Sequence, residues 1–131
     1  AIAAGICVGQ GLGDNARAGL ITRGLAETAR LASQLGAKSH TISGLAGIGD
    51  LVLSCSGPHS RNMAFGFALG SANPLPTSLA EGRFSASILK ARSKYESIEL
   101  PICFAVDDIV NGDADIHTRI SALLSRQAGQ E

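Results

Sequence analysis

The sequence predicts an all-α domain, and three features of the 131-residue chain lead to this prediction. Apolar residues recur at spacings of three and four through most segments, as they do on the buried face of a helix. No segment shows the sustained two-residue alternation of a half-buried strand. Aromatic residues make up only 4% of the chain, and the alanines and leucines that dominate instead suit closely packed helices. The length is sufficient for one domain with its own core.

The longest predicted helix covers residues 14–35. Asp14 can cap its N-terminus, and Gly36 follows its last residue as a typical stop signal. Between these signals, an apolar stripe occupies one face and polar residues occupy the others. The stripe consists of Ala18, Ile21, Leu25, Ala29, Ala32 and Leu35, and the polar faces carry Arg17, Arg23, Glu27, Arg30 and Gln34.

Shorter helices are predicted for the middle of the chain. Residues 41–55 are apolar and rich in glycine, which indicates two short helical pieces that end at Gly57 and the proline after it. A further helix is expected over residues 60–69, with Ser60 as its N-cap. Residues 71–77 contain two prolines and are predicted to form a loop.

Three helices are predicted for the C-terminal part. The first follows Glu81, and the second begins at Pro101, because proline is favoured at the first helical position. Asp113 or Asp115 is expected to cap the third. The first helix is indicated by Phe84, Ile88, Leu89, Arg92 and Tyr95, and the second by Ile102, Ala105, Val106 and Ile109; in the third, Ile116, Ile120, Leu123 and Leu124 are expected to face inward.

The overall charge limits the classes of partner. Eleven basic residues balance eleven acidic ones, so neither nucleic acid nor an anionic membrane is expected as the main partner. The apolar start, residues 1–8, is too short to span a bilayer and has no basic flank, so we expect no stable membrane insertion. Three scattered cysteines form no disulfide framework or metal-ligand spacing, which favours a reducing cytoplasm and no metal site.

A glycine-rich segment before the long helix imitates a nucleotide-binding turn. Residues 11–16 fit the pattern GxGxxA, after an apolar run and before a helix. The pattern alone is weak, and the acid expected about 20 residues further on, at the end of a second strand, is missing. The rest of the chain is predicted to be helical, so no parallel sheet would carry the turn. We therefore interpret these glycines as shaping a loop.

Asp50 is the first candidate for a catalytic or substrate-binding residue. It is the only carboxylate in an apolar stretch, and burying a carboxylate is costly unless it is paired. In a helix, Ser54 would lie on the same face, one turn later. The structural alternative for Asp50 is a helix N-cap or a structural hydrogen bond.

The tripeptide Ser60-Arg61-Asn62 suggests an anion site. A helix that begins here presents free N–H groups and the positive end of its dipole. Arg61 in that first turn is electrostatically unfavourable unless an anion binds, and N–H groups, arginine and asparagine together suit a phosphate. The alternative is a solvent-facing arginine beside an ordinary serine cap. If Asp50 faced the same cavity, the pair of sites would suit a small phosphorylated substrate with a hydroxyl or carbonyl group.

Glu81 is a weaker candidate. It follows a proline-containing loop, and its carboxylate could accept a hydrogen bond from a ribose hydroxyl; the alternative is a solvated acid at a helix start. The three histidines have no partners at useful spacing, and His59 is of interest only because it adjoins the tripeptide.

Three blocks of this sequence resemble the bacterial type of NAD(P)-dependent glycerol-3-phosphate dehydrogenase. They are GLGDNARA at residues 11–18 with its continuation to residue 25, GLAGIGDLVLSC at residues 44–55 running on to Ser60-Arg61-Asn62, and LAEG at residues 79–82 with the later Leu-Pro-Ile at residues 100–102. The second block is long and specific, and the resemblance covers nearly the whole chain.

The resemblance implies a fold and an activity. The chain would be a single helical C-terminal domain, residues 1–131, similar to that of 6-phosphogluconate dehydrogenase. A Rossmann domain, absent from this chain, would be its partner and would bind most of the NAD or NADP. The family interconverts dihydroxyacetone phosphate and sn-glycerol 3-phosphate in glycerophospholipid synthesis in the cytoplasm. A homodimer is an open alternative.

The resemblance also implies roles for individual residues. Asp50 matches an acid that supports the catalytic lysine, which the family carries just before the position of Ala1. Ser60, Arg61 and Asn62 match substrate contacts, with Arg61 also reaching the cofactor. Leu79 and Glu81 match cofactor-contacting positions, and Ser54 stands where the family usually has threonine.

Two other interpretations remain at this point. The chain could be a non-catalytic helical docking or dimerisation module that has kept the sequence of its ancestor. It could also be the helical half of another hydroxyacid or ketoacid reductase, although the block from Asp50 to Asn62 argues against this. A chain that lacks the cofactor domain and the lysine is expected to be inactive alone.

Overall fold

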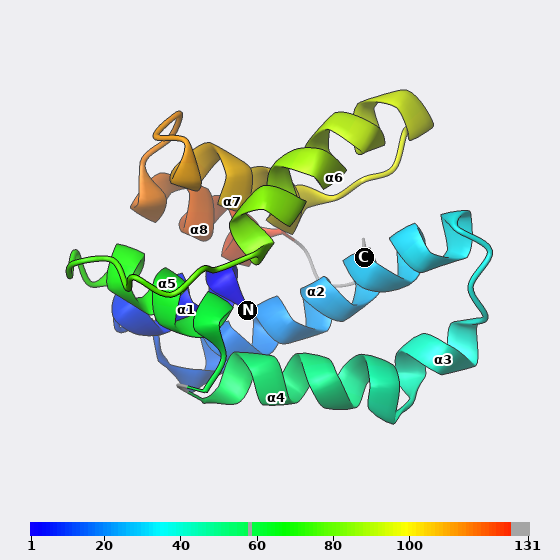
Figure 1. Ribbon diagram of the computed structural model, residues 1–131, viewed down its shortest axis with the longest axis horizontal. Coiled ribbons are helices and arrows are strands. Elements are labelled where there is room, and N and C mark those ends of the chain that lie inside the picture. The colour runs from blue at the N-terminus through cyan, green and yellow to red at the C-terminus, as the bar shows by residue number, and fades with distance from the viewer. Residues whose placement is uncertain (58, 127–131) are drawn as a thin grey trace.

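The computed structural model describes residues 1–57 and 59–126 of the chain, and helices joined by turns and loops make up these residues, without a strand. The all-α prediction is therefore confirmed. Figure 1 shows the arrangement, in which the long helix α2 runs between α3 and α4 on one side and α7 and α8 on the other. In chain order the helices are α1 (Ile2–Gly9), α2 (Gly13–Gln34), α3 (Ser39–Ser43), the π-helical turn η1 (Leu45–Gly49), α4 (Asp50–Ser56), α5 (Arg61–Gly70), α6 (Gly82–Glu96), α7 (Pro101–Val110) and α8 (Ile116–Ser125).

Helices α1 and α5 pack backbone against backbone at the centre of the domain. Each has two glycines four residues apart at the contact. A Cβ atom on Gly9 would lie 2.5 Å from the carbonyl oxygen of Phe67, and one on Gly5 would lie 2.7 Å from the Phe67 nitrogen. In return, a Cβ on Gly66 or Gly70 would meet the α1 backbone. Glycine is required at these positions because no side-chain atom fits between the helices.

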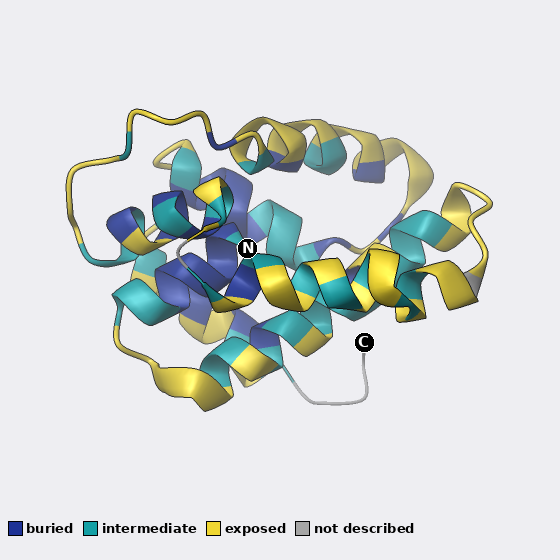
Figure 2. Cartoon of the chain, turned by 60° about the horizontal axis from the view of Figure 1, so that its bottom comes forward, coloured by how far each residue is buried: buried dark blue, intermediate teal, exposed yellow. Residues whose placement is uncertain are grey.

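The core forms around α1. Ile6 and Cys7 have no exposed surface, and burial raises the pKa of the Cys7 thiol, so this cysteine is a protonated core residue. Figure 2 shows the buried residues gathered around the N-terminus of the chain, while the peripheral helices are mainly exposed. The other members of this core include Ile2, Leu20, Phe65, Val106, Ile109, Ile120 and Leu123.

Glu27 is buried, so its prediction as a solvent-facing residue of α2 was wrong. Its side chain is 5% exposed, and its two carboxylate oxygens accept hydrogen bonds from the backbone nitrogens of Ile102 and Cys103 at 2.8 and 3.0 Å. These N–H groups lie in the first turn of α7, where no earlier carbonyl is available to accept from them. The predicted Pro101 start is confirmed. Leu100 at the N-cap has no polar side chain, so a carboxylate from α2 caps α7 instead.

Removing this cap is expected to weaken the domain. Glu27→Ala would leave two buried N–H groups of α7 without an acceptor, and we expect the free energy of unfolding to fall by about 2 kcal/mol. Thermal unfolding followed by circular dichroism measures the effect. Glu96→Ala is the matched control, because Glu96 pairs only with Arg92 on the exposed surface and its loss should cost less than about 0.5 kcal/mol. Equal losses in the two variants would contradict the structural role of Glu27.

Helix α6 is present as predicted, and several of the residues that indicate it face solvent. The apolar residues Phe84, Ile88 and Tyr95 are 51%, 67% and 91% exposed, whereas Ala86 and Ser93 are buried. Leu89 is half-buried and Arg92 is exposed. The helix that these residues indicate is therefore present, but most of them lie outside its buried face. The orientation is set by charge pairing with α7, which needs the face that carries Lys90.

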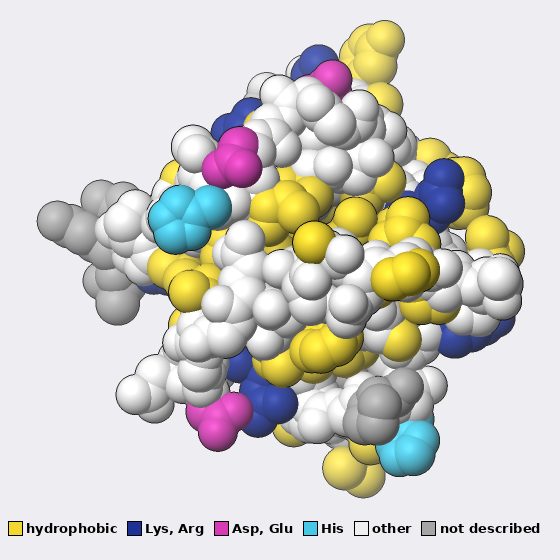
Figure 3. Space-filling view, turned by 90° about the vertical axis from the view of Figure 1, so that its left-hand side faces the viewer, with side chains coloured by type: hydrophobic (Ala, Val, Ile, Leu, Met, Phe, Trp, Pro, Cys, Tyr) yellow, Lys and Arg dark blue, Asp and Glu magenta, His cyan; other side chains and the backbone are white. Residues whose placement is uncertain are grey.

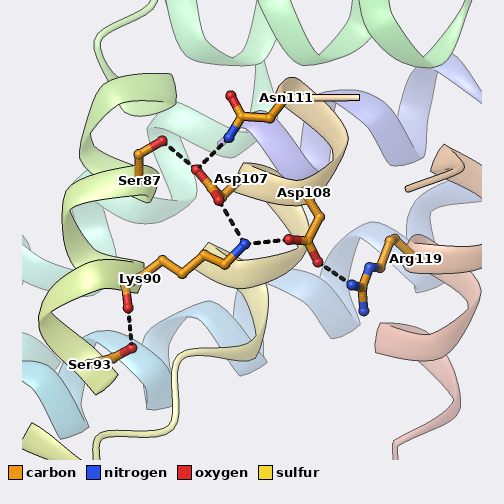
Figure 4. Close-up of polar contacts among 7 residues, drawn as sticks. All are labelled: Ser87, Lys90, Ser93, Asp107, Asp108, Asn111 and Arg119. Carbon is orange, nitrogen blue, oxygen red and sulfur yellow. Dashed lines mark hydrogen bonds and ion pairs between the residues drawn. The ribbon is translucent and has the colours of Figure 1, made fainter. Parts of the chain in front are cut away.

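An ionic cluster around two buried carboxylates joins α6, α7 and α8 (Figure 4). The Lys90 ammonium lies between the carboxylates of Asp107, at 2.8 Å, and Asp108, which also pairs with Arg119 of α8. Asp107 accepts further hydrogen bonds from the Ser87 hydroxyl and, at 3.0 Å, from the Asn111 amide. The hydrogen bonds from Lys90 and Ser87 lower the pKa of Asp107, and the two carboxylates raise the pKa of Lys90.

Several predicted boundaries hold and others move. Ser60 caps α5, with its hydroxyl accepting from the Met63 nitrogen at 3.3 Å, and Asp115 rather than Asp113 caps α8. Asp14 is not a cap: α2 starts one residue earlier, and Asp14 pairs with Arg17 at 2.9 Å.

Two glycine-rich segments also have definite structures. Gly11 and Gly13 adopt the left-handed φ angles of 70° and 83° in the turn between α1 and α2, which confirms their interpretation as loop formers. Residues 41–55, predicted as two helical pieces, lie in three: α3, η1 and α4. The proline after Gly57 lies outside the described residues.

Candidate functional site

Helix α4 carries the first two predicted site residues. Asp50 is its first residue and is exposed, and Ser54 lies one turn later and is half-buried. On another face of this helix, Cys55 is buried with Ala4 of α1 and Met63 of α5, and Leu51 and Ala1 pack against them. The packing therefore places α4 beside the start of α1 and the first turn of α5.

The π-helical turn η1 sets the position of Asp50. It ends at Gly49, and Gly49 is the N-cap of α4. Asp50 is the first residue inside that helix, so the alternative prediction that Asp50 is an N-cap is wrong. Gly47 lies against the backbone of α3, where a Cβ atom would be 2.5 Å from the carbonyl carbon of Ile42. Single π-turns are rare and occur frequently at functional sites.

The first turn of α5 carries the predicted anion-binding residues. Ser60 uses its hydroxyl to cap the helix, Arg61 is exposed, and Asn62 is half-buried. Among the residues that the structure describes, Arg61 takes part in none of the ion pairs. A guanidinium group at the positive end of a helix, without a carboxylate beside it, provides a favourable environment for an anion.

A single hydrogen bond brings two predicted site segments together. The side-chain oxygen of Asn62 accepts from the backbone nitrogen of Gly82 at 2.9 Å, across 20 residues of sequence. Gly82 begins α6, and the exposed Glu81 immediately before it makes no capping bond with its side chain. Leu79 is 52% exposed in the approach to this helix. Figure 1 shows α5 and α6 both beginning close to the N-terminus of the chain.

A small cavity lies where these elements meet. Its volume is about 170 Å³, and it is lined by residues of α1, α5, α6 and α7. Asn62 and Ser85 contribute polar groups, Ala1 lies at one side, and the other walls are mainly apolar. Cys103 also borders it, and burial together with the Glu27 carboxylate raises the pKa of this thiol, so it is not a thiolate nucleophile at neutral pH.

The remaining polar side chains give no sign of a metal or nucleic-acid site. Within residues 1–57 and 59–126, the histidine, cysteine, aspartate and glutamate side chains form no group suited to a metal ion. In Figure 3, acidic and basic side chains are scattered over the visible face, and hydrophobic ones reach it in several places. None of the described helices is both long and apolar enough to cross a membrane.

Sequence reasoning did not identify Gly82 as part of the site. A signal was present, because a glycine in the first turn of a helix sacrifices helix propensity and so indicates a spatial or functional constraint. The described contacts link the segments around Ser60–Asn62 and Leu79–Gly82, while α4 approaches α5 through Cys55 and Met63 rather than through Asp50 or Ser54.

The fold and these contacts define a helical domain with a small, mainly apolar cavity, bordered by Asn62, where α1, α5, α6 and α7 meet. The family model described as the C-terminus of NAD-dependent glycerol-3-phosphate dehydrogenase matches residues 1–121. The chain therefore belongs to this family, as its C-terminal domain.

Individual relatives agree with this assignment. The chain is 49% identical, over 96% of its length, to glycerol-3-phosphate dehydrogenase (NAD(P)+) of Rhodospirillum rubrum, and 46% identical over its whole length to the protein of the same name from Hyphomonas neptunium. It also matches a crystal structure of glycerol-3-phosphate dehydrogenase from Coxiella burnetii, with a TM-score of 0.90 and 43% identity over 95% of the chain. It spans only 38%, 41% and 40% of these three proteins.

Proposed function

We propose that this domain binds dihydroxyacetone phosphate or sn-glycerol 3-phosphate for an NAD(P)-dependent dehydrogenase that interconverts the two. The observation that carries the proposal is the first turn of α5, where the exposed Arg61 has no ion pair among the described residues and adjoins Asn62. A phosphate dianion is an acceptor with several oxygens, and arginine, asparagine and free helix N–H groups are all donors to it. The relatives are named glycerol-3-phosphate dehydrogenases, which supports glycerol 3-phosphate as one member of this pair.

Each site residue has a proposed part in this binding. Arg61 pairs with the phosphate, Asn62 donates to a substrate oxygen, and Ser60 holds the start of α5 in place. The phosphate contacts fix the ketone at one position, so that binding energy is used for orientation. Cys55 of α4 packs against α1, and the family resemblance puts the lysine that protonates the developing alkoxide just before α1, so Asp50 and Ser54 are proposed to act there. A carboxylate there would hold the charge and the position of that lysine.

The nicotinamide cofactor is proposed to reach this domain at its edge only. It supplies the hydride when bound, and most of its contacts are assigned to a Rossmann domain that adjoins this one. Within this chain, Leu79, Glu81 and Arg61 are the proposed contacts. Their exposure at the junction of α5 and α6 fits this assignment, because Glu81 makes no capping bond and its carboxylate is free to accept from ribose hydroxyls.

A second candidate function is a docking or dimerisation module. It is favoured by exposed apolar side chains on η1, α4 and α6, including Leu45, Leu53 and Ile88 at 91%, 72% and 67% exposure. Patches of this kind indicate a surface that another domain or subunit covers. A cytoplasmic location is proposed for either function, in accord with three cysteines that are all free.

The decisive assay uses the full-length natural protein that contains these residues. We expect reduction of dihydroxyacetone phosphate with NADH or NADPH. Arg61→Ala should lower kcat/KM about 100-fold, because a charged hydrogen bond to phosphate is lost in both the complex and the transition state.

Arg92→Ala is the control, because Arg92 is an exposed arginine of α6 whose described partner is Glu96, one turn further on. Its kcat/KM should stay within about twofold of the wild type. A wild-type protein that is inactive on dihydroxyacetone phosphate but forms stable dimers at micromolar concentration would favour the docking function instead.

A further inference from the structure

The backbone N–H of Gly82 has an unusual acceptor. As the first residue of α6, Gly82 has a free donor that an N-cap side chain or water normally satisfies. Glu81 does not cap it with its carboxylate, and the acceptor is instead the Asn62 side-chain oxygen, 2.9 Å away on α5. Two helices are thus joined by one bond between a backbone group and a carboxamide.

This bond fixes which end of the carboxamide faces the cavity. A backbone N–H can only donate, so the Asn62 side chain must turn its oxygen toward Gly82. Its NH2 group then points away, and the described hydrogen bonds give it no acceptor. Because Asn62 also lines the 170 Å³ cavity between α1, α5, α6 and α7, the group left for a ligand there is a donor.

We propose that Gly82 is a positioning residue for substrate binding, because its N–H holds the Asn62 amide with the NH2 group toward a substrate oxygen. This inference rests on the proposed function. The phosphate, hydroxyl and carbonyl oxygens of the substrate all accept hydrogen bonds, and a flipped amide would oppose one of them with its own oxygen. The bond to Gly82 removes the flipped state before the substrate arrives, which is a form of preorganisation.

The lack of a side chain at Gly82 is also needed to hold the Asn62 amide in this orientation. A Cβ atom there would lie 2.9 Å from the Asn62 side-chain oxygen, 3.1 Å from its Cγ and 3.2 Å from the Cδ1 of Ile2. The backbone of Gly82 is helical, so alanine is permitted by its φ angle and has the higher helix propensity. Only space excludes it. The atom in the way is the end of a side chain, so the amide is displaced while the fold survives.

The test is a double-mutant cycle in the full-length natural protein. Gly82→Ala should raise the KM for dihydroxyacetone phosphate about tenfold and leave the KM for NADH and the melting temperature nearly unchanged. In an Asn62→Ala background the obstructing amide is gone, so adding Gly82→Ala should change kcat/KM by less than about twofold.

Asn62→Asp gives a second measure. Its carboxylate still accepts from the Gly82 nitrogen, so the melting temperature should hold, but it offers no donor, and kcat/KM should fall at least about tenfold. Gly24→Ala is the control for adding a methyl group at a helical glycine, because its Cβ would meet only the Cδ1 of Ile102, at an ordinary 3.8 Å. Its kinetic constants should match those of the wild type.

The outcomes distinguish failure of the positioning role of Gly82 from failure of the proposed function. Equal effects of Gly82→Ala in the wild type and in the Asn62→Ala background would overturn the positioning role and leave the proposed function standing. An unchanged KM for dihydroxyacetone phosphate in Gly82→Ala would also overturn the positioning role and leave the proposed function standing. A wild-type protein with no activity on dihydroxyacetone phosphate would overturn both.

Discussion

Replacing Gly66 with alanine is expected to lower the free energy of unfolding by at least about 3 kcal/mol, although alanine is the better helix former. The added Cβ would overlap the backbone of Ile2, with its Cα atom 3.0 Å away and its carbonyl oxygen nearer still. Backbone atoms cannot rotate aside as a side chain can, so the whole contact between α1 and α5 must open. Opening it loosens the core around Ile6, which has no exposed surface.

Urea unfolding followed by far-UV circular dichroism would measure this loss. Gly19→Ala is the matched control, because Gly19 lies inside helix α2 and its Cβ would have no neighbour within 4 Å. Alanine there should stabilise the domain by about 0.5–1 kcal/mol. If Gly66→Ala unfolded at the same urea concentration as Gly19→Ala, the backbone contact between the two helices would be wrong.

Replacing Lys90 with methionine is expected to cost about 3–5 kcal/mol near neutral pH. Methionine fills a similar volume but leaves the carboxylates of Asp107 and Asp108, with side chains only 8% and 10% exposed, without the ammonium between them. Arg119 remains paired with Asp108, while Asp107 keeps only the neutral partners Ser87 and Asn111. Removing one member of a buried ionic group leaves an uncompensated charge, which is the costly case.

The pH dependence of this cost follows from the pKa shifts. The pKa of Asp107 is lowered in the folded state, so its stabilisation is present above its unfolded pKa and is lost as the pH falls through the folded value. The pKa of Lys90 is raised, so its stabilisation is present below its unfolded pKa and is lost as the pH rises through the folded value. The difference between wild type and Lys90→Met should therefore be largest between these limits and shrink in acid.

Unfolding of the wild type and the variant near pH 7 and at about pH 3 would test this dependence. Lys94→Met is the control, because Lys94 is an exposed lysine one turn further along the same helix. Its effect should stay within about 0.5 kcal/mol at both pH values. A cost for Lys90→Met that did not change with pH would show that lost packing, rather than charge, determines its stability.

Local signals in the sequence predicted the elements that depend on local physics. The Ser60 cap and the Pro101 start were predicted, and the cap of α8 was narrowed to Asp113 or Asp115, because each depends on residues within one turn. The period of the apolar residues was sufficient to assign an all-α domain and the extent of α2. Boundaries in residues 41–55 were less certain, because a π-turn against α3 is set by the close approach of Gly47 to Ile42.

The errors concern contacts between distant parts of the chain. Glu27 was predicted to face solvent because periodicity treats every charged residue as exposed, and nothing in α2 reveals that the first turn of α7 needs an acceptor. The buried face of α6 likewise depends on distant residues, since Lys90 meets Asp107 and Asp108 of α7, about 20 residues away. For the site, the sequence indicated both segments, but only the structure reveals the bond between Asn62 and Gly82.

The pairing of α1 with α5 also has a consequence for synthesis on the ribosome. Helix α1 is translated before α5, yet its glycine face has no partner until residues 61–70 have left the exit tunnel. At roughly 5–20 residues per second, this apolar helix waits for several seconds with the side chains of Ile2 and Ile6 uncovered. The helix that is most protected in the finished domain is therefore the one that is most vulnerable to aggregation, and most open to chaperones, while the chain is being made.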